Sequence, residues 1–307
     1  VRLAPREEQK LTNEIGAEFW SSVSPDGRQL LYQALPAGQP ITDPRHSLLF
    51  AKAVGARAQP VKIQEDVFEA AWSPAGARLV FLRLAGNLAQ LLTREADGRT
   101  ERLLVSGNVL YSSWRNSPPY NRTQPKSWSW SPDGERIAYC ARQNGVANVW
   151  VVRADNAQAT QLSANADAAV QLECPLWSPD GQHLAYLMQT RVPAESWSVW
   201  GNQQGRAMLL FQSAAPVRLL GWTANRELLI AQVSNTVGAR SQPTTAQLIN
   251  LRLNENGLAA QLPLGTLTEV YLNTLQIPAT GRAVAWVSLQ NGRSDVWFSP
   301  LGKQQLG

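Results

Sequence analysis

The residues that most often carry out chemistry are scarce in this chain. It has 307 residues but only two histidines, two cysteines and two methionines. It contains no His-Glu-x-x-His or Cys-x-x-Cys zinc signature, no phosphate loop, no Gly-x-Ser-x-Gly nucleophile elbow and no Asp-x-Asp-x-Asp-Gly calcium loop. These absences predict a protein that is not an enzyme and that needs no metal or cofactor.

The few histidines and cysteines lie far apart in sequence. We interpret His183 as an ordinary surface residue. Cys140 ends one predicted strand and Cys174 begins another, and both strand ends are expected to lie toward the same face of the ring. Two alternatives stay open, a disulfide between Cys140 and Cys174 or two buried free thiols. A disulfide would indicate an oxidising compartment.

Long apolar runs and blocks of one charge are also missing. Without an apolar run of about 18 residues, no membrane span is expected in this segment. The net charge is +5, but the basic residues are scattered and never form a run longer than a pair, so we expect no nucleic-acid binding by this domain. The chain starts at Val1 without a signal peptide, which favours a piece of a longer protein, tethered by sequence that precedes Val1.

The chain does contain a recurring turn. It reads Ser-Pro-Asp-Gly, with alanine for aspartate in the second copy, and tryptophan precedes the last three copies. This order suits a type I turn, because proline presets the second position and glycine is favoured at the fourth. A tyrosine or phenylalanine stands five residues after each glycine. The copies are Ser24–Gly27, Ser73–Gly76, Ser131–Gly134 and Ser178–Gly181, and the aromatics are Tyr32, Phe81, Tyr139 and Tyr186.

Short apolar runs flank these turns and are typical of buried strands. Second strands of each unit are expected at 28–32, 77–81, 135–139 and 182–186, third strands at 148–152, 198–200 and 295–298, and fourth strands at 61–63, 102–105, 161–162 and 208–211. Degenerate copies of the turn follow at Trp222–Arg226 and Pro278–Gly281. Six units of about 45 to 58 residues predict an all-β fold, a six-bladed β-propeller of four-stranded antiparallel blades, as a single domain over 1–307.

The first unit begins late, which bears on how the ring closes. Gln9–Thr12 resembles a fourth strand that stands before the first hairpin. We expect this N-terminal strand to complete the last blade beside 295–298, which would remove an open sheet edge. Gln304–Leu306 could compete for the same place.

One connection breaks the period. Residues Gly107–Ser127 add about ten residues between the second and third units and interleave aromatic with basic side chains. Such a loop at the channel mouth suits the recognition of a polar ligand or a peptide, although it could equally be an ordered loop that covers the blades. Its candidate binding residues are Tyr111, Trp114, Arg115, Tyr120, Arg122 and Lys126.

Residues a few positions before each hairpin turn should line the inner rim of the same mouth. These candidates are Trp20, Glu69, Trp128, Glu173 and Arg218. Glu69 and Glu173 are the pair to consider if the channel holds an enzyme, because converging carboxylates could act on a sugar. The repeat tryptophans Trp72, Trp130, Trp177 and Trp222 are expected to pack one blade against the next.

The Trp-Ser-Pro-Asp-Gly phrase with its apolar run and aromatic resembles the repeat of TolB-like β-propellers. Lys10–Thr12 and Thr160–Ser163 resemble the Leu-Thr fourth strand of that family, whereas the last two units depart from the pattern. The resemblance covers almost the whole chain and is specific for fold, but one fold hosts many roles.

We consider three hypotheses for the function. The first is a non-enzymatic sensor propeller that recognises a protein or small polar ligand at the channel mouth, as the periplasmic or otherwise extracytoplasmic domain of a membrane-bound bacterial transcriptional regulator. The second is a TolB-type protein-interaction scaffold. The third is a propeller hydrolase or lyase that acts on a sugar or peptide in the central channel.

Overall fold

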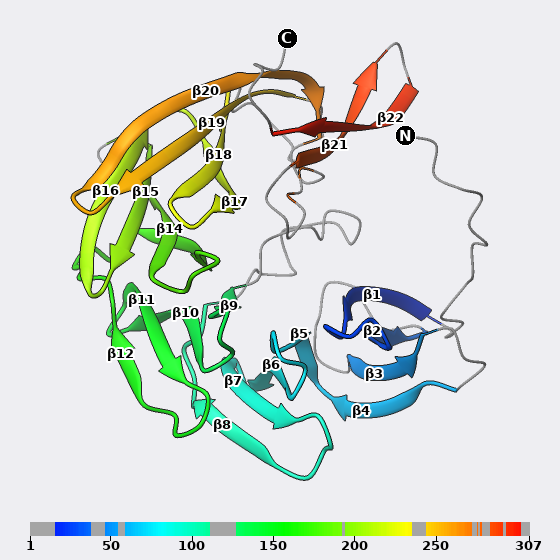
Figure 1. The fold of residues 1–307 in the computed structure, drawn as a ribbon. Helices are drawn as coiled ribbons and strands as arrows, with labels where there is room; N and C mark the ends of the chain where they lie inside the picture. The colour runs from blue at the N-terminus through cyan, green and yellow to red at the C-terminus, as the bar shows by residue number, and fades with distance from the viewer. Residues whose placement is uncertain are drawn as a thin grey trace.

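The computed structural model describes residues 16–37, 47–54, 59–110, 127–191, 194–234, 244–271, 275, 277, 283–290 and 293–301. Its elements in these ranges are β-strands, arranged as blades around a centre (Figure 1). No helix among the described residues is long and apolar enough to cross a membrane.

Five blades have four strands each. Every blade is an antiparallel meander with its strands in sequence order, the first nearest the centre and the fourth at the outside (Figure 1). Blade one holds β1 (Gly16–Val23), β2 (Gln29–Pro36), β3 (Leu48–Ala53) and β4 (Val61–Glu65), and blade two holds β5 (Val67–Trp72), β6 (Arg78–Ala85), β7 (Leu88–Glu95) and β8 (Glu101–Val105). Blade three holds β9 (Trp128–Trp130), β10 (Arg136–Gln143), β11 (Val146–Arg153) and β12 (Ala159–Gln161). Blade four holds β13 (Gln171–Trp177), β14 (His183–Thr190), β15 (Ser196–Gln203) and β16 (Arg206–Ser213), and blade five holds β17 (Val217–Ala224), β18 (Glu227–Val233), β19 (Thr244–Asn254) and β20 (Gly257–Val270).

The last two strands extend the sheet of blade five. β21 (Ala283–Gln290) and β22 (Arg293–Pro300) form a hairpin, and β21 joins β20 at the pair Val270 and Ser288 to give a six-stranded sheet. The all-β, antiparallel, four-stranded blade architecture and the strand predicted at 295–298 are confirmed. The count of six blades stays a prediction, and the closing strand predicted at 9–12 lies outside the described residues.

Each Ser-Pro-Asp-Gly turn is built as the sequence predicts. The glycine N–H donates to the serine carbonyl at 2.8 to 2.9 Å in all four copies, and each glycine has φ between +68° and +73°, a region that disfavours other residues. The serine hydroxyl accepts the N–H five residues on, as from Arg136 to Ser131 at 2.9 Å. The aspartates are therefore turn residues, as expected.

Hydrogen bonds to these turn aspartates favour their ionised form. Ser24 and the backbone N–H of Arg28 hold the pKa of Asp26 below its usual range. At Asp133, burial opposes ionisation, but hydrogen bonds from Ser131 and from the Glu135 N–H more than offset it and lower the pKa.

Successive turns touch one another around the ring. A methyl group added at Gly76 would lie 3.3 Å from Cδ of Pro25, one at Gly134 would lie 3.6 Å from Cδ of Pro74, and one at Gly181 would lie 3.4 Å from Cδ of Pro132. In the first three units the proline therefore packs against the glycine of the next unit. The repeat phrase sets the register between blades as well as the turn within a blade.

The core lies within and between the blades. The aromatic that follows each turn is buried, with Phe81 at 0% exposure and Tyr32, Tyr139 and Tyr186 at 2%. Burial raises the pKa of both Tyr139 and Tyr186 to about 12, so their phenols are neutral across the physiological range. The prediction that these residues anchor the second strands is confirmed by their places in β2, β6, β10 and β14.

Candidate functional site

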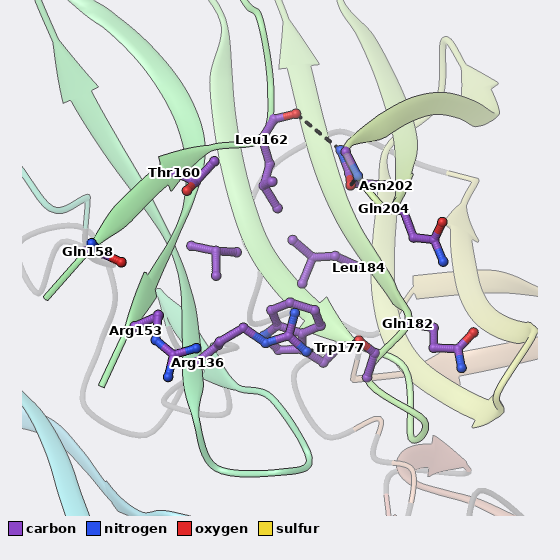
Figure 2. Close-up of a pocket in the computed structure, with 13 residues that line it drawn as sticks. Arg136, Arg153, Gln158, Thr160, Leu162, Trp177, Gln182, Leu184, Asn202 and Gln204 are labelled. Atoms are coloured by element: carbon purple, nitrogen blue, oxygen red, sulfur yellow. Dashed lines mark hydrogen bonds between the residues drawn. The ribbon is translucent and has the colours of Figure 1, made fainter. Parts of the chain in front are cut away.

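A cavity of about 420 Å³ lies between blades three and four. It opens where the turns between first and second strands and between third and fourth strands meet, since Gly181 and Gln182 line it from one kind of turn and Gln158 and Gln204 from the other. Figure 2 shows the side chains of Gln158, Gln182 and Gln204 around the groove. The volume falls within the range of small-ligand sites. We call this cavity the groove.

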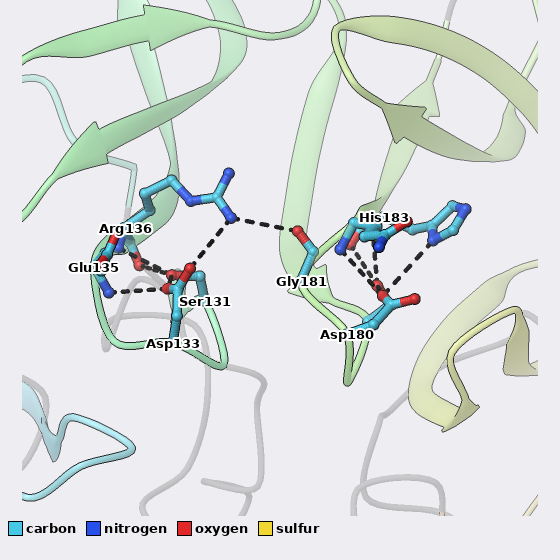
Figure 3. Close-up of polar contacts among 9 residues, drawn as sticks. Ser131, Asp133, Glu135, Arg136, Asp180, Gly181 and His183 are labelled. Carbon is cyan, nitrogen blue, oxygen red and sulfur yellow. Dashed lines mark hydrogen bonds and ion pairs between the residues drawn. The ribbon is translucent and has the colours of Figure 1, made fainter.

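An arginine and a tryptophan from neighbouring blades meet in the groove. Arg136, at the start of β10, places its guanidinium carbon 4.7 Å from the ring centroid of Trp177, at the end of β13 (Figure 2). Its Nη2 atom lies 3.5 Å from a carboxylate oxygen of Asp133 and donates to the Gly181 carbonyl at 3.4 Å (Figure 3). Trp177 thus packs one blade against the next, as predicted.

A second arginine lies beside the first, on the neighbouring strand. Arg153 in β11 is the direct cross-strand partner of Arg136. It also lines the groove, and it donates from Nε and Nη2 to the two carboxylate oxygens of Asp155 at 3.0 and 2.7 Å. This ion pair keeps the pKa of Asp155 below its usual range.

The rest of the lining combines apolar side chains with amide and hydroxyl groups on either side of them (Figure 2). Val151, Leu162 and Leu184 supply the apolar part. Asn202 ties the two blades together, because its Nδ2 donates to the Leu162 carbonyl at 3.2 Å (Figure 2). Around the rim stand exposed glutamine and threonine side chains, namely Gln158, Thr160, Gln182 and Gln204. These groups could bind hydrogen-bonding partners above an apolar surface.

His183 occupies the position in blade four that Arg136 occupies in blade three. Its ring centroid lies 6.0 Å from that of Trp222 in blade five, and the side chain is 1% exposed. Trp222 in turn donates from Nε1 to the Leu176 carbonyl of blade four at 3.0 Å. The interpretation of His183 as a surface residue is therefore wrong, because at this position both Arg136 and His183 lie beside a tryptophan of the next blade.

Burial lowers the pKa of His183 below its ordinary value of 6.5, an effect that Asp180 opposes and Arg226 reinforces. The Asp180 carboxylate lies 3.8 Å from Nδ1, beyond hydrogen-bond distance (Figure 3). The folded protein consequently binds fewer protons at His183 than the unfolded chain does. The contribution of neutral His183 to the free energy of unfolding is therefore fully present above pH 6.5 and decreases as the pH falls below it.

We expect the free energy of unfolding to decline between about pH 7 and pH 5 by a His183-dependent amount of at most about 1.4 kcal/mol per pH unit. His183→Gln should flatten this dependence, since Gln29 fills the same position in blade one. Urea denaturation at several pH values measures it. An equal pH slope in the wild type and the variant would contradict the assignment.

The opposite face of the ring holds Glu69, one of the predicted rim residues. Its carboxylate is 1% exposed and accepts hydrogen bonds from the N–H of Ser127 at 2.9 Å and from its hydroxyl at 3.0 Å. Glu69 lies at an irregularity in β5 with φ of 53°, a strained value for a residue with a side chain. It therefore fastens blade two to the residue just before β9.

The other predicted rim residues differ in how deeply they are buried. Trp128 is 2% exposed and belongs to the hydrophobic core with Phe68 and Tyr139, so it packs rather than lining an open rim. Arg218 is partly buried in β17, and Glu173 is exposed in β13. Glu69 and Glu173 lie in blades two and four with blade three between them, so they are not carboxylates of neighbouring blades.

The remaining predicted binding residues lie outside the part of the chain that the structure describes, or their side chains do. Tyr111, Trp114, Arg115, Tyr120, Arg122 and Lys126 are outside the described residues, and so is the side chain of Trp20. Cys140 is a free, buried thiol rather than half of a disulfide, and burial together with the Glu173 charge raises its pKa to about 12. The Cys174 side chain lies outside the described part of the structure.

Sequence reasoning missed the groove. It placed every binding candidate on the face of the connections between blades, whereas the groove opens among the hairpin turns. One signal was available: Arg153-Ala154-Asp155 occupies the place that Glu95-Ala96-Asp97 has in blade two, with the charge of the first residue reversed.

Comparisons with known proteins bear on the fold. No family model and no curated protein matches the chain. Among solved structures, TolB from Acinetobacter baumannii matches with a TM-score of 0.53 and 14% identity over 90% of this chain and 61% of that one. The β-propeller domain of the Trilobed protease from Pyrococcus furiosus matches with a TM-score of 0.60 and 8% identity over 93% and 81%.

Part of a larger peptidase is also similar in fold to this chain. Dipeptidyl peptidase 4 of Porphyromonas gingivalis matches with a TM-score of 0.59 and 12% identity over 91% of this chain, which spans 44% of the peptidase. At these identities the likeness is one of fold alone. The chain has a β-propeller fold similar to that of TolB and of propeller domains in peptidases.

Proposed function

We propose that this propeller is a non-enzymatic protein-interaction scaffold that binds an extended segment of a partner polypeptide in the groove. The observation that carries the proposal is the lining of the groove, where apolar side chains lie beside amides and guanidinium groups. An extended peptide offers both apolar side chains and unpaired main-chain groups, so it matches both halves of this surface. The similarity of the fold to TolB supports a scaffold role.

The test is a selection of random nine-residue peptides by display on the complete 307-residue chain, followed by calorimetric titration of the selected peptides. Thr160→Trp, which fills the rim of the groove, should weaken binding at least about tenfold by excluding the peptide from its apolar contacts. The matched control is Thr100→Trp, which places the same bulk at the smaller cavity between blades two and three. Binding that Thr160→Trp leaves unchanged would contradict the groove as the binding surface.

We also propose a context for the scaffold, the extracytoplasmic sensor domain of a membrane-bound bacterial transcriptional regulator. The TolB-like repeat supports this context. The sequence of the complete gene tests it: a membrane span with a winged-helix or kinase domain upstream is expected. A hydrolase domain downstream would contradict it.

A further inference from the structure

The same pair of cross-strand positions occurs in each of the five blades, and the charges of the residues that fill it differ at the groove. It pairs the first residue of the second strand with a residue of the third strand. The pairs are Gln29 with Ala53, Arg78 with Glu95, Arg136 with Arg153, His183 with Gln203, and Glu227 with Arg252.

Blades two and five fill this position with opposite charges that touch. Arg78 lies 2.8 Å from Glu95, and Arg252 lies 2.8 Å from Glu227. Blade three alone among the five places two like charges there. Like charges directly opposite on neighbouring strands destabilise a sheet. In blade three each arginine instead pairs with a turn carboxylate outside the groove lining, Arg136 with Asp133 and Arg153 with Asp155, and no carboxylate lies between the two strands at this position.

The two neighbouring cavities differ in the same way. The one between blades two and three is about 130 Å³, and its lining includes the carboxylates of Glu95 and Asp155. The groove is about 420 Å³, and its described lining includes both arginines but no carboxylate. The larger space thus occurs where the cross-strand carboxylate is missing.

Each arginine keeps hydrogen-bond donors for another group. Arg136 uses Nη2 for both Asp133 and Gly181, which leaves Nε and Nη1. Arg153 uses Nε and Nη2 for Asp155, which leaves Nη1. Within the described part of the chain these three nitrogens have no hydrogen-bond partner, and guanidinium groups bind carboxylates strongly.

We propose that the groove holds a carboxylate subsite, in which Arg136 and Arg153 bind the acidic side chain of a peptide that also contacts the glutamine rim. The ligand carboxylate lies next to Arg136 in blade three as the Glu95 carboxylate lies next to Arg78 in blade two. This inference rests on the proposed function and narrows the partner to a segment that contains aspartate or glutamate.

The decisive variant is Arg153→Glu, which gives blade three the arrangement of blade two. The introduced carboxylate can pair with Arg136, so the melting temperature should stay within a few degrees of the wild type. The carboxylate of the peptide should lose one of its two arginine partners and be repelled by the introduced carboxylate. Peptides selected by the wild type should carry aspartate or glutamate at one fixed position, and Arg153→Glu should weaken them at least about tenfold.

The matched control is Arg99→Glu, the same charge change at an exposed turn that does not line the groove. It should leave affinity within about twofold, because exposed charges act weakly across solvent. Replacing the peptide's acidic residue with its amide should weaken binding to the wild type but should no longer weaken binding to Arg153→Glu.

Four results would overturn the subsite. The carboxylate subsite would be wrong if peptides bound in the groove without a preference for an acidic residue. It would also be wrong if peptides lost affinity equally in Arg153→Glu and Arg99→Glu. Neither result would contradict the scaffold function. Failure to select any peptide would contradict both the carboxylate subsite and the peptide-binding scaffold. Glucuronate or inorganic phosphate that shifts the indole resonance of Trp177, with no peptide doing so, would show a small-anion site instead.

Discussion

Replacing Phe81 with alanine is expected to lower the free energy of unfolding by about 4 kcal/mol. Phe81 is fully buried and packs in one cluster with Leu79 and Leu92 of its own blade and with Leu31 and Leu49 of blade one. The substitution leaves a cavity between two blades that cannot collapse without moving both sheets. Guanidinium denaturation followed by circular dichroism measures the change.

Phe298→Ala is the matched control, because the same side chain there is 66% exposed. It should change the free energy of unfolding by less than about 0.5 kcal/mol. A loss at Phe81 below about 1 kcal/mol would mean that the two blades do not share a packed core at this seam.

Replacing Glu69 with alanine is expected to cost about 3 kcal/mol, the second largest effect. The change removes charge-assisted hydrogen bonds to Ser127 and leaves the N–H and hydroxyl of Ser127 buried without them. Glu69→Gln keeps one acceptor and should cost less than half as much. Guanidinium denaturation gives the energies, and hydrogen exchange at the Ser127 amide should accelerate in the alanine variant.

Glu173→Ala serves as the control, since Glu173 is an exposed glutamate in the first strand of blade four. Its expected effect is within about 0.5 kcal/mol. Equal losses at the two positions would indicate a general effect of charge on the ring rather than a bond between blades two and three.

The strands and turns could be predicted because their causes are local. Ser131–Gly134 sets its own turn through the serine hydroxyl and the aspartate carboxylate, and the apolar run that follows needs no distant information. The buried aromatic five residues after each glycine follows from the same spacing. The predicted strands in the described ranges therefore fall on strands of the structure, although the second strands run four residues beyond their predicted ends.

The groove could not be predicted in the same way because it depends on contacts between units. Whether Arg136 lies over Trp177 is decided by the angle between two blades, and the two residues belong to different units of the sequence. The burial of His183 has the same origin, since Trp222 belongs to the next blade. Only an alignment of the units by strand register would have shown that Arg153 replaces the acidic residue of blade two.

The contact between a proline and the following unit's glycine has a consequence for how such a chain could have grown. Each of the four regular units has the proline and the glycine of this contact in its sequence, and the three contacts between these four units are formed. A unit duplicated in tandem would therefore meet its own copy through a joint that already fits. The fifth unit has Ala224 and Arg226 at these places, so a copy of it would have no such joint to offer.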